Sequence, residues 1–355
     1  MSAATRPEIG IVGCGNIGRR HARLLREQDV PLAGGADIAQ AAREAFASEF
    51  GVSTYEDHAG LYDVADAVIV TTPNRFHEGP VVDALEAGLD VLVEKPLAND
   101  VASAARIAAA ASDADGFCMV GFHTRFESDV EVVTDYVDAG RFGELSHVEA
   151  DFLRRRGVPG RGSWFTSREV AGGGALIDIG VHAVDLSLYL LGYPDVEEVT
   201  GVTRSQFGDR EDYTYLQMWG DDQGPAGFDV EDSASAFLRC ADGKTVSLEV
   251  AWAANRPPEQ EYVLRGTEAG ATFDRGAGEL TVHETDPKGG GHMSDAAIET
   301  ADRDAHAAEQ AYFVEHVAGG TEPARNTVEQ GLTVQRVLEA IYEADETGSA
   351  VTLED

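Results

Sequence analysis

The sequence predicts an α/β protein of two domains: an N-terminal doubly wound parallel sheet, and a C-terminal α+β domain with an open, largely antiparallel sheet. A chain of 355 residues exceeds what one hydrophobic core usually serves. Short apolar runs alternate with helical stretches at first, whereas strand-like runs follow one another after residue 192. We therefore expect domains at 1–123 and 124–355.

The first domain shows the alternation of strand and helix that is typical of a doubly wound sheet. The run at 67–72 is apolar except for its closing threonines, as a strand buried on both faces requires. We expect strands at 8–13, 32–37, 67–72, 91–94 and 117–121, and helices at 17–27, 39–50, 78–87 and 100–111.

In the second domain the spacing of turn residues separates several short strands. We expect strands at 145–153, 234–240, 245–251, 261–265 and 271–274, helices at 128–139, 177–191, 305–317 and 327–343, and loops at 209–232 and 286–291. The last helix places Val328, Leu332, Leu338 and Ile341 on one face.

The charge balance is extreme, with 63 acidic against 27 basic residues and a net charge of −36. Lysine occurs only at Lys95, Lys244 and Lys288. Carboxylates spread along a lysine-poor chain favour a protein kept soluble in concentrated salt, although an ordinary acidic protein remains an alternative. Nucleic-acid binding is disfavoured because no basic stripe is present.

Cysteine usage and hydropathy predict a cytoplasmic protein. Cys14, Cys118 and Cys240 are far apart, and we expect buried, reduced thiols with no zinc or redox role. No apolar run approaches the roughly 20 residues that cross a bilayer, and nothing indicates export. We therefore expect neither a metal site nor a membrane partner.

A glycine-rich loop between the first strand and the first helix predicts a dinucleotide site of the Rossmann type. In this loop Gly13 allows the tight turn, Gly15 lets the backbone approach a pyrophosphate, and Gly18 permits close packing of helix on strand. Asn16 and Ile17 open the helix, whose N-terminal N–H groups attract phosphate.

Asp37 ends the second strand, where a carboxylate accepts hydrogen bonds from the adenosine ribose and repels a 2′-phosphate. This position favours NAD over NADP. Arg43 is the one nearby cation that could bind the 2′-phosphate of NADP. Thr72 ends the apolar strand at 67–72, Asn74 and His77 come shortly after it, and we expect all three on the nicotinamide side of the same crevice.

The segment Glu94-Lys95-Pro96 ends the next strand of the first domain. A lysine at this position can hold the reacting oxygen of a substrate and stabilise its negative charge. A surface ion pair is the alternative, but it fits poorly with a sequence that otherwise avoids lysine.

Asp178 and His182 are four residues apart on a predicted helix that follows Gly172-Gly173-Gly174, so both project from one face. A histidine oriented by a carboxylate is a proton acceptor near neutral pH. On spacing alone, a buried structural pair fits equally well.

Together these segments resemble the Gfo/Idh/MocA oxidoreductases, which include glucose–fructose oxidoreductase and inositol dehydrogenase. The resemblance rests on the glycine loop, on Glu94-Lys95-Pro96, on 121–126 and on 172–185, and it extends over nearly the whole chain. It implies that Lys95, Asp178 and His182 are catalytic and that Glu94 and Lys95 also line the cofactor site.

By this resemblance, His182 takes the proton of a secondary hydroxyl while hydride leaves for the nicotinamide. The resemblance also implies a sugar, a polyol or a sugar acid as substrate, and a homodimer or homotetramer joined through the open sheet. Two alternatives remain: an NAD-dependent glycoside hydrolase of the same fold, and a nucleotide-binding regulator without catalysis.

Further candidates for substrate contact flank these motifs. Four arginines occur within 154–161, and they suit either an acidic substrate or internal ion pairs. The residues expected to contact substrate, besides Asp178 and His182, are His123, Arg125, Arg154 and Trp164, with Asn255 as a weaker candidate.

Overall fold

The computed structural model describes residues 6–215 and 220–353, and these form two compact units. The first unit holds Met1–His123 together with Asp304–Gln335, and the second holds Thr124–Arg303 together with Arg336–Asp355. The sequence prediction keeps everything after residue 123 in one continuous domain, whereas in the structure 304–335 return to the first unit.

The first unit contains a six-stranded sheet in the order β3-β2-β1-β4-β5-β6, and all its pairings are parallel. Its strands are β1 (Ile9–Val12), β2 (Leu32–Ala36), β3 (Thr54–Tyr55), β4 (Ala67–Val70), β5 (Asp90–Glu94) and β6 (Cys118–Gly121). The predicted doubly wound parallel sheet is therefore confirmed. β3 was not predicted, because two residues are too few to show a pattern.

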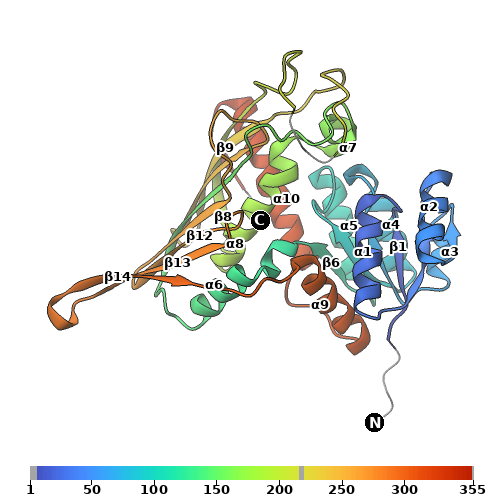
Figure 1. Cartoon of the computed structure of the whole chain (residues 1–355), viewed down its shortest axis with the longest axis horizontal. Helices are drawn as coiled ribbons and strands as arrows, with labels where there is room; N and C mark the ends of the chain where they lie inside the picture. Colours follow the sequence, from blue (N-terminus) through green and yellow to red (C-terminus); the bar gives the residue numbers. More distant parts are fainter. Residues whose placement is uncertain (1–5, 216–219, 354–355) are drawn as a thin grey trace, which may run out of the picture. The chain divides into compact units, whose positions relative to one another are not determined.

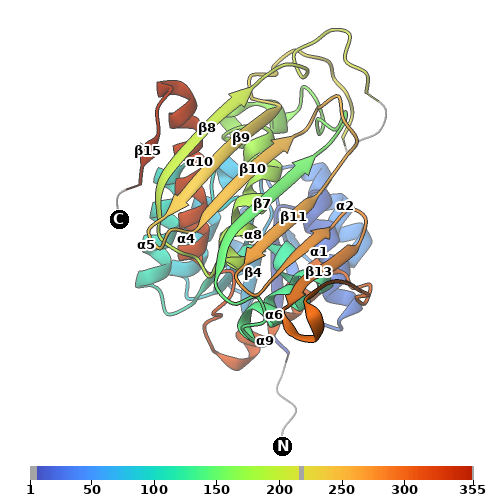
Figure 2. The ribbon, with the colours of Figure 1, turned by 90° about the vertical axis from the view of Figure 1, so that its left-hand side faces the viewer.

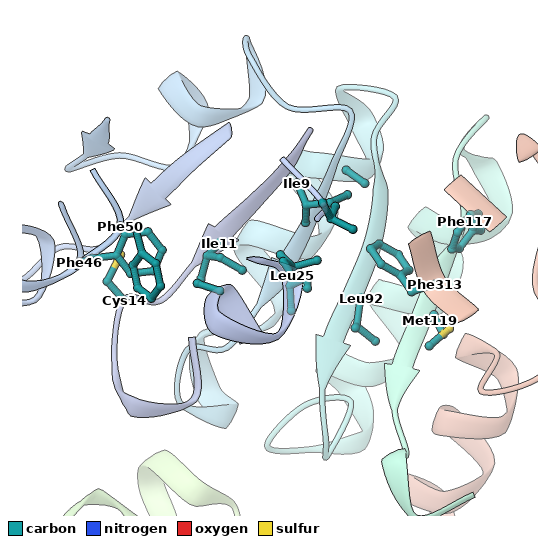
Figure 3. Packing of buried hydrophobic residues seen from close by; sticks show 14 residues of the cluster. Ile9, Ile11, Cys14, Leu25, Phe46, Phe50, Leu92, Phe117, Met119 and Phe313 are labelled. Carbon is teal, nitrogen blue, oxygen red and sulfur yellow. The ribbon is translucent and has the colours of Figure 1, made fainter. Parts of the chain in front are cut away.

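Helices cover both faces of this sheet (Figure 1). They are α1 (Asn16–Glu27), α2 (Gln40–Phe50), α3 (Ala59–Tyr62), α4 (Glu78–Glu86), α5 (Val101–Asp113), α9 (Ala305–Gly319) and the first part of α10 (Val328–Thr347). Leu25, Phe46 and Phe313, from α1, α2 and α9, share one apolar cluster with Ile9 and Ile11 of β1 (Figure 3).

Packing on β6 explains why 304–335 belong to the first unit. The ring of Phe313 lies edge-on to that of Phe117, with centroids 5.8 Å apart. Asn326 accepts a backbone hydrogen bond of 2.8 Å from Val120 and returns one of 3.0 Å from its side-chain amide. Contacts this distant in sequence leave no local pattern from which to predict them.

The second unit contains a nine-stranded sheet in the order β14-β13-β12-β11-β7-β10-β9-β8-β15. All its pairings are antiparallel except that of β7 with β10, so the predicted open, largely antiparallel sheet is confirmed. The strands are β7 (Leu145–Leu153), β8 (Val196–Arg204), β9 (Ser233–Cys240), β10 (Thr245–Ala251), β11 (Glu261–Gly266), β12 (Ala269–Asp274), β13 (Glu279–Asp286), β14 (His292–Ile298) and β15 (Val351–Thr352).

Strands β8, β13, β14 and β15 were not predicted from the sequence. In β8 the pairing register shifts between Val196 and Glu198, which breaks the alternation of apolar and polar residues. In β14 every side chain is exposed or half-buried, so this strand has no buried face to produce a pattern.

Helices pack on one face of this sheet, and Figure 2 shows its other face without a helix. They are α6 (Ser128–Asp138), α7 (Arg168–Ala171), α8 (Val181–Leu190) and the end of α10. The stretch Arg168–Leu190 is long and apolar enough to cross a membrane, but 89% of its apolar window is buried inside the structure. This burial is what a core helix shows, so the stretch is weak evidence for a membrane span.

Candidate active site

The loop between β1 and α1 has the backbone that its glycines predict. Gly13 has a φ of 100°, a backbone conformation that residues other than glycine rarely adopt. A Cβ atom on Gly18 would lie 1.9 Å from the carbonyl oxygen of Gly13, so only glycine allows α1 to approach β1 this closely. A Cβ atom on Gly15 would meet nothing within 4 Å, so the backbone there faces open space.

The N-terminus of α1 suits the pyrophosphate of a dinucleotide. Gly15 caps the helix without any side-chain hydrogen bond, and the first turn holds no acidic residue. Gly15, Asn16 and Ile17 are exposed. Unpaired N–H groups at an uncapped helix start bind anions well, so these residues fit the cofactor.

Asp37 stands directly after β2, beside the glycine loop. Its Oδ2 accepts a hydrogen bond of 2.8 Å from the backbone N–H of Cys14, and its Oδ1 accepts one of 2.8 Å from Ala39. Arg43 donates to the carbonyl oxygens of Asp37 and Ile38, at 2.7 and 3.0 Å. Because these bonds hold the Arg43 guanidinium against the backbone, the environment favours a ribose hydroxyl over a phosphate.

The residues after β4 differ in how accessible they are. Thr72 is half-buried and donates from its hydroxyl to the carbonyl of Phe76, while Asn74 is buried. His77 is also buried, and its ring nitrogens face the carbonyl oxygens of Thr72 at 2.8 Å and Pro96 at 3.0 Å. The His77 ring therefore joins the loops that follow β4 and β5, which favours a structural role over contact with the cofactor.

Glu94 ends β5, and Lys95 precedes Pro96 across a cis peptide bond. The Oε1 atom of Glu94 lies 2.8 Å from Nε2 of His21, and its Oε2 atom accepts from the backbone N–H of Lys95 at 3.3 Å. Burial alone raises the pKa of Glu94, but the hydrogen bond from His21 and the positive charge around the carboxylate, that of His21 first, lower it to about 2.

In the second unit Asp178 lies in a single turn of π-helix, Leu176–Gly180, which runs into α8. Such turns occur frequently at functional sites. The sequence predicts an ordinary α-helix here, so the π-helical turn is a correction to the local geometry. His182 lies in the first turn of α8 and is buried.

Two side chains from distant segments hold the carboxylate of Asp178. The indole Nε1 of Trp252 donates to Oδ2 at 2.9 Å, and Nη1 of Arg154 lies 3.5 Å from the same oxygen. Burial lowers the pKa of Arg154, although the nearby charge of Asp178 opposes this effect. Arg154, predicted to contact substrate, thus lies beside one of the predicted catalytic residues.

A buried carboxylate, Glu231, holds the start of this helix. Its Oε1 atom accepts hydrogen bonds of 2.9 Å each from the backbone N–H groups of Gly174 and Leu176 and from the hydroxyl of Tyr342. Burial raises its pKa against the effect of these bonds. A Cβ atom would lie 2.0 Å from the Tyr342 hydroxyl at Gly173 and 1.9 Å from the Glu231 carbonyl at Gly174. These close approaches explain the consecutive glycines.

Arg125 and His123, both predicted to contact substrate, each have a partner within their own unit. Arg125 and Asp185 have no exposed side-chain surface, and the guanidinium donates to both carboxylate oxygens and to the Tyr193 hydroxyl. Arg125 is therefore a core residue of the second unit. In the first unit the ring of His123 stacks on His306, with centroids 3.7 Å apart.

Two further arginines of the 154–161 loop, Arg156 and Arg161, are engaged within the second unit, while Arg155 is exposed. Arg156 donates to the carbonyl of Ala254 and to the side chain of Asn255. Arg161 makes a two-pronged ion pair with Asp222. Trp164 is half-buried, and its ring lies 3.6 Å from that of Phe165.

Sequence reasoning missed Trp252, Glu231 and Tyr342. A tryptophan directly after a buried strand was a usable signal, because a buried indole N–H needs an acceptor. Glu231 lies at the end of an acidic loop, where nothing distinguishes it from its neighbours. Among residues 6–215 and 220–353, no group of three histidine, cysteine or acidic side chains is placed to hold a metal ion.

Comparisons with known proteins agree with this arrangement. Residues 8–122 match the family described as "Oxidoreductase family, NAD-binding Rossmann fold", and residues 130–272 match the "GFO/IDH/MocA C-terminal domain". D-glucoside 3-dehydrogenase of Escherichia coli is 32% identical over 97% of both chains.

Two further relatives are similar along almost their whole length. D-xylose 1-dehydrogenase (NADP(+)) 2 of Haloferax volcanii is 29% identical over 98% of this chain and 99% of its own. A levoglucosan dehydrogenase solved in complex with NADH superposes with a TM-score of 0.85 at 21% identity, covering 98% of this chain and 99% of that one.

The fold and these matches confirm the predicted nicotinamide-dependent oxidoreductase. This chain belongs to the GFO/IDH/MocA oxidoreductase family and binds NAD.

Proposed function

We propose that this protein oxidises a secondary hydroxyl of an uncharged sugar, most specifically the 3-hydroxyl of a glucoside, with NAD as hydride acceptor. One observation carries the choice of an uncharged substrate: Arg154, the arginine beside Asp178, is already paired with that carboxylate. Arg156 and Arg161 are also engaged internally. The net charge of −36 further disfavours acidic substrates.

The preference for position 3 comes from the E. coli relative, whose name states a D-glucoside 3-dehydrogenase and which aligns along 97% of this chain. A sugar acid, which the arginine-rich loop allows at the level of sequence, becomes the less favoured substrate. A polyol remains compatible with the same polar groups.

When bound, NAD accepts hydride from the carbon that carries the reacting hydroxyl. We assign the removal of the hydroxyl proton to His182. Asp178, fixed by Trp252 and Arg154, orients the substrate and supports the charge that forms on His182. Lys95 donates a hydrogen bond to the reacting oxygen and stabilises its developing negative charge.

We also propose that the protein works as a cytoplasmic homodimer or homotetramer. One face of the nine-stranded sheet has no helix on it (Figure 2), and Val202 on β8 and Phe237 on β9 are 48% and 45% exposed. Apolar side chains on an uncovered sheet suit contact with a second copy. A Phe237→Glu variant should lower the mass measured by light scattering, and an unchanged mass would remove this face as the interface.

The function is tested by following NADH absorbance with methyl glucosides, their 3-deoxy analogues, inositols, glucuronate and glucose 6-phosphate. We expect turnover of the methyl glucosides, none of the 3-deoxy analogues, and a 3-keto product in the NMR spectrum. Turnover confined to glucuronate or the phosphate would overturn the choice of an uncharged sugar. A Lys95→Met variant with full turnover would overturn the mechanism.

The two alternative functions give different results in the same assay. A glycoside hydrolase would release the aglycone from a nitrophenyl glucoside without net formation of NADH. A regulator would bind NAD without turning over any of these compounds.

A further inference from the structure

One peptide group of the glycine loop is held by side chains from both sides of β1. The carbonyl oxygen of Gly13 accepts a hydrogen bond of 2.8 Å from the hydroxyl of Thr71. The N–H of Cys14, which belongs to the same peptide, donates one of 2.8 Å to Oδ2 of Asp37. Thr71 follows β4 and Asp37 follows β2, the two strands that flank β1. The peptide between Gly13 and Cys14 is therefore held at both ends.

These two side chains extend the hydrogen bonding of the sheet by one peptide. In the preceding peptide, the carbonyl of Val12 accepts from the backbone N–H of Thr71 at 2.8 Å. The N–H of Gly13 in that peptide donates to the carbonyl of Ala36, also at 2.8 Å. One residue later, the side chains of Thr71 and Asp37 supply the partners from the same two sides.

The peptide needs this support because its first residue resists rotation very little. Gly13 has no Cβ atom, so its backbone turns readily through conformations that other residues avoid. If the peptide rotated, the Gly13 oxygen would turn towards the carboxylate of Asp37, where two acceptors would face each other. Thr71 thus stabilises the observed orientation, while Asp37 stabilises it and also disfavours the rotated one.

The Thr71 hydroxyl also lies against the start of α1. A Cβ atom on Gly18 would lie 2.9 Å from Oγ1 of Thr71 and 1.9 Å from the carbonyl oxygen of Gly13. The hydroxyl, this carbonyl and Gly18 therefore occupy one closely packed place. The side chain of Thr71 is half-buried there.

The orientation of this peptide affects the groups that face the phosphates. Gly15, Asn16 and Ile17 follow directly and are exposed at the uncapped start of α1. Rotation of the peptide changes ψ of Gly13 and φ of Cys14, and so redirects the loop that leads to these N–H groups. A loop that populates the rotated form binds pyrophosphate only with the remaining fraction of molecules.

We infer that Thr71 is a positioning residue of the NAD site: its hydroxyl, together with Asp37, holds the Gly13–Cys14 peptide in the orientation that receives the pyrophosphate. Asp37 thereby has a role in loop geometry beside its expected contact with the adenosine ribose. The inference rests on NAD binding by this family, and not on the identity of the sugar or on the proposed catalytic residues. Its failure would leave the proposed substrate untouched.

The first test is Thr71→Val, which keeps the shape of the side chain and removes its hydroxyl. Dissociation constants are measured on the full chain for NAD⁺ and ADP by calorimetry, and for adenosine by NMR titration. The affinities for NAD⁺ and ADP should fall about two- to tenfold, the range expected for losing one hydrogen bond between uncharged groups. Adenosine has no phosphate and should bind as before.

Two further variants control this measurement. Thr71→Ser keeps the hydroxyl and should retain the wild-type affinities. Thr134→Val removes a hydroxyl that donates to the carbonyl of Val130 at 2.8 Å in the second unit, and it should bind all three compounds as the wild type does. If Thr71→Val does not fold, Thr71→Ala removes the same hydroxyl and takes its place.

Hydrogen exchange of single amides, followed by NMR, tests the orientation itself. Without the Thr71 hydroxyl, the N–H of Cys14 should exchange several times faster, because its peptide rotates away from Asp37. The N–H of Gly13, in the preceding peptide, should stay as protected as in the wild type and serves as the internal reference. Unchanged affinities for NAD⁺ and ADP, an equal loss for adenosine, or exchange rates that change together at both amides would each overturn the inference.

Discussion

The indole of Trp252 donates a 2.9 Å hydrogen bond to Oδ2 of Asp178, and its side chain is entirely buried. The backbone of Trp252 is itself held by a 2.8 Å bond from its N–H to the carbonyl of Asp232. One rigid aromatic side chain thus links a strand end of the nine-stranded sheet to the π-helical turn. The orientation of the Asp178 carboxylate depends on this link.

We expect Trp252→Phe to lower kcat by about ten- to a hundredfold, because a hydrogen bond to a charged acceptor contributes about 1.5–3 kcal/mol. The affinity for NAD should stay unchanged, since Trp252 lies in the second unit and the glycine loop in the first. Tyr262→Phe, another buried aromatic of the same sheet, serves as the control for general disturbance of the core. A kcat equal to that of the wild type would show that Asp178 does not need this donor.

Glu231 should contribute to both stability and turnover. Glu231→Ala leaves the N–H groups of Gly174 and Leu176 without their acceptor, and each buried unpaired group costs about 1–3 kcal/mol. Urea unfolding should show this loss, with a smaller one in Tyr342→Phe, which removes a single donor. Glu211→Ala, in an exposed loop, is the control. Equal midpoints for Glu231→Ala and Glu211→Ala would contradict the role of Glu231.

The parts of this molecule that a sequence can predict are those whose physical cause is local. The glycine loop, Asp37 and the strand–helix alternation follow from turns, periodicity and short spacings, and the structure places them as expected. Trp252 and Glu231 act on Asp178 and on Gly174 from segments 57 to 74 residues away, so no spacing indicates them.

A residue close to a motif in the sequence can also have a structural role that is unrelated to that motif. Arg125 follows the last strand of the first sheet and so was expected in the crevice, but its charge is taken up by Asp185, 60 residues further on. A single sequence does not show which of the chain's many carboxylates an arginine will meet. The partner decides whether the arginine is a core residue or a substrate ligand.

Stability should increase with salt concentration. With a net charge of −36, the folded chain repels itself, and raising ionic strength from about 0.1 to 1 M shortens the screening length from about 10 to 3 Å. We expect the Tm in 1 M KCl to exceed that in 0.1 M KCl by several degrees. An equal osmolality of sucrose separates screening from solvent exclusion. A Tm that falls or stays level in KCl would contradict adaptation to salt.

His306 should make the first unit sensitive to mild acid. Burial lowers its pKa from 6.5 to about 4 in the folded chain, so between these values the unfolded chain binds a proton that the folded chain does not. Stability is therefore full above pH 6.5 and falls as the pH decreases to about 4. His306→Gln should lose less stability over this range, by up to about 3 kcal/mol. His316→Gln, further along α9, is the control, and equal pH slopes for all three proteins would contradict the assignment.

Asp37→Ser should weaken the discrimination between NAD and NADP by about tenfold or more, because it removes a charge that repels the 2′-phosphate. The serine hydroxyl can still accept from one of the two N–H groups that the carboxylate binds, so the loop should persist.

Arg43 limits the gain in NADP affinity, because its Nη1 stays on backbone carbonyls and its Nη2 lies 3.9 Å from Glu56. Adding Glu56→Gln to the variant should therefore raise NADP affinity further. Binding of both cofactors is measured by calorimetry beside Asp63→Ser, an exposed control. An unchanged ratio in Asp37→Ser would mean that another group selects the cofactor.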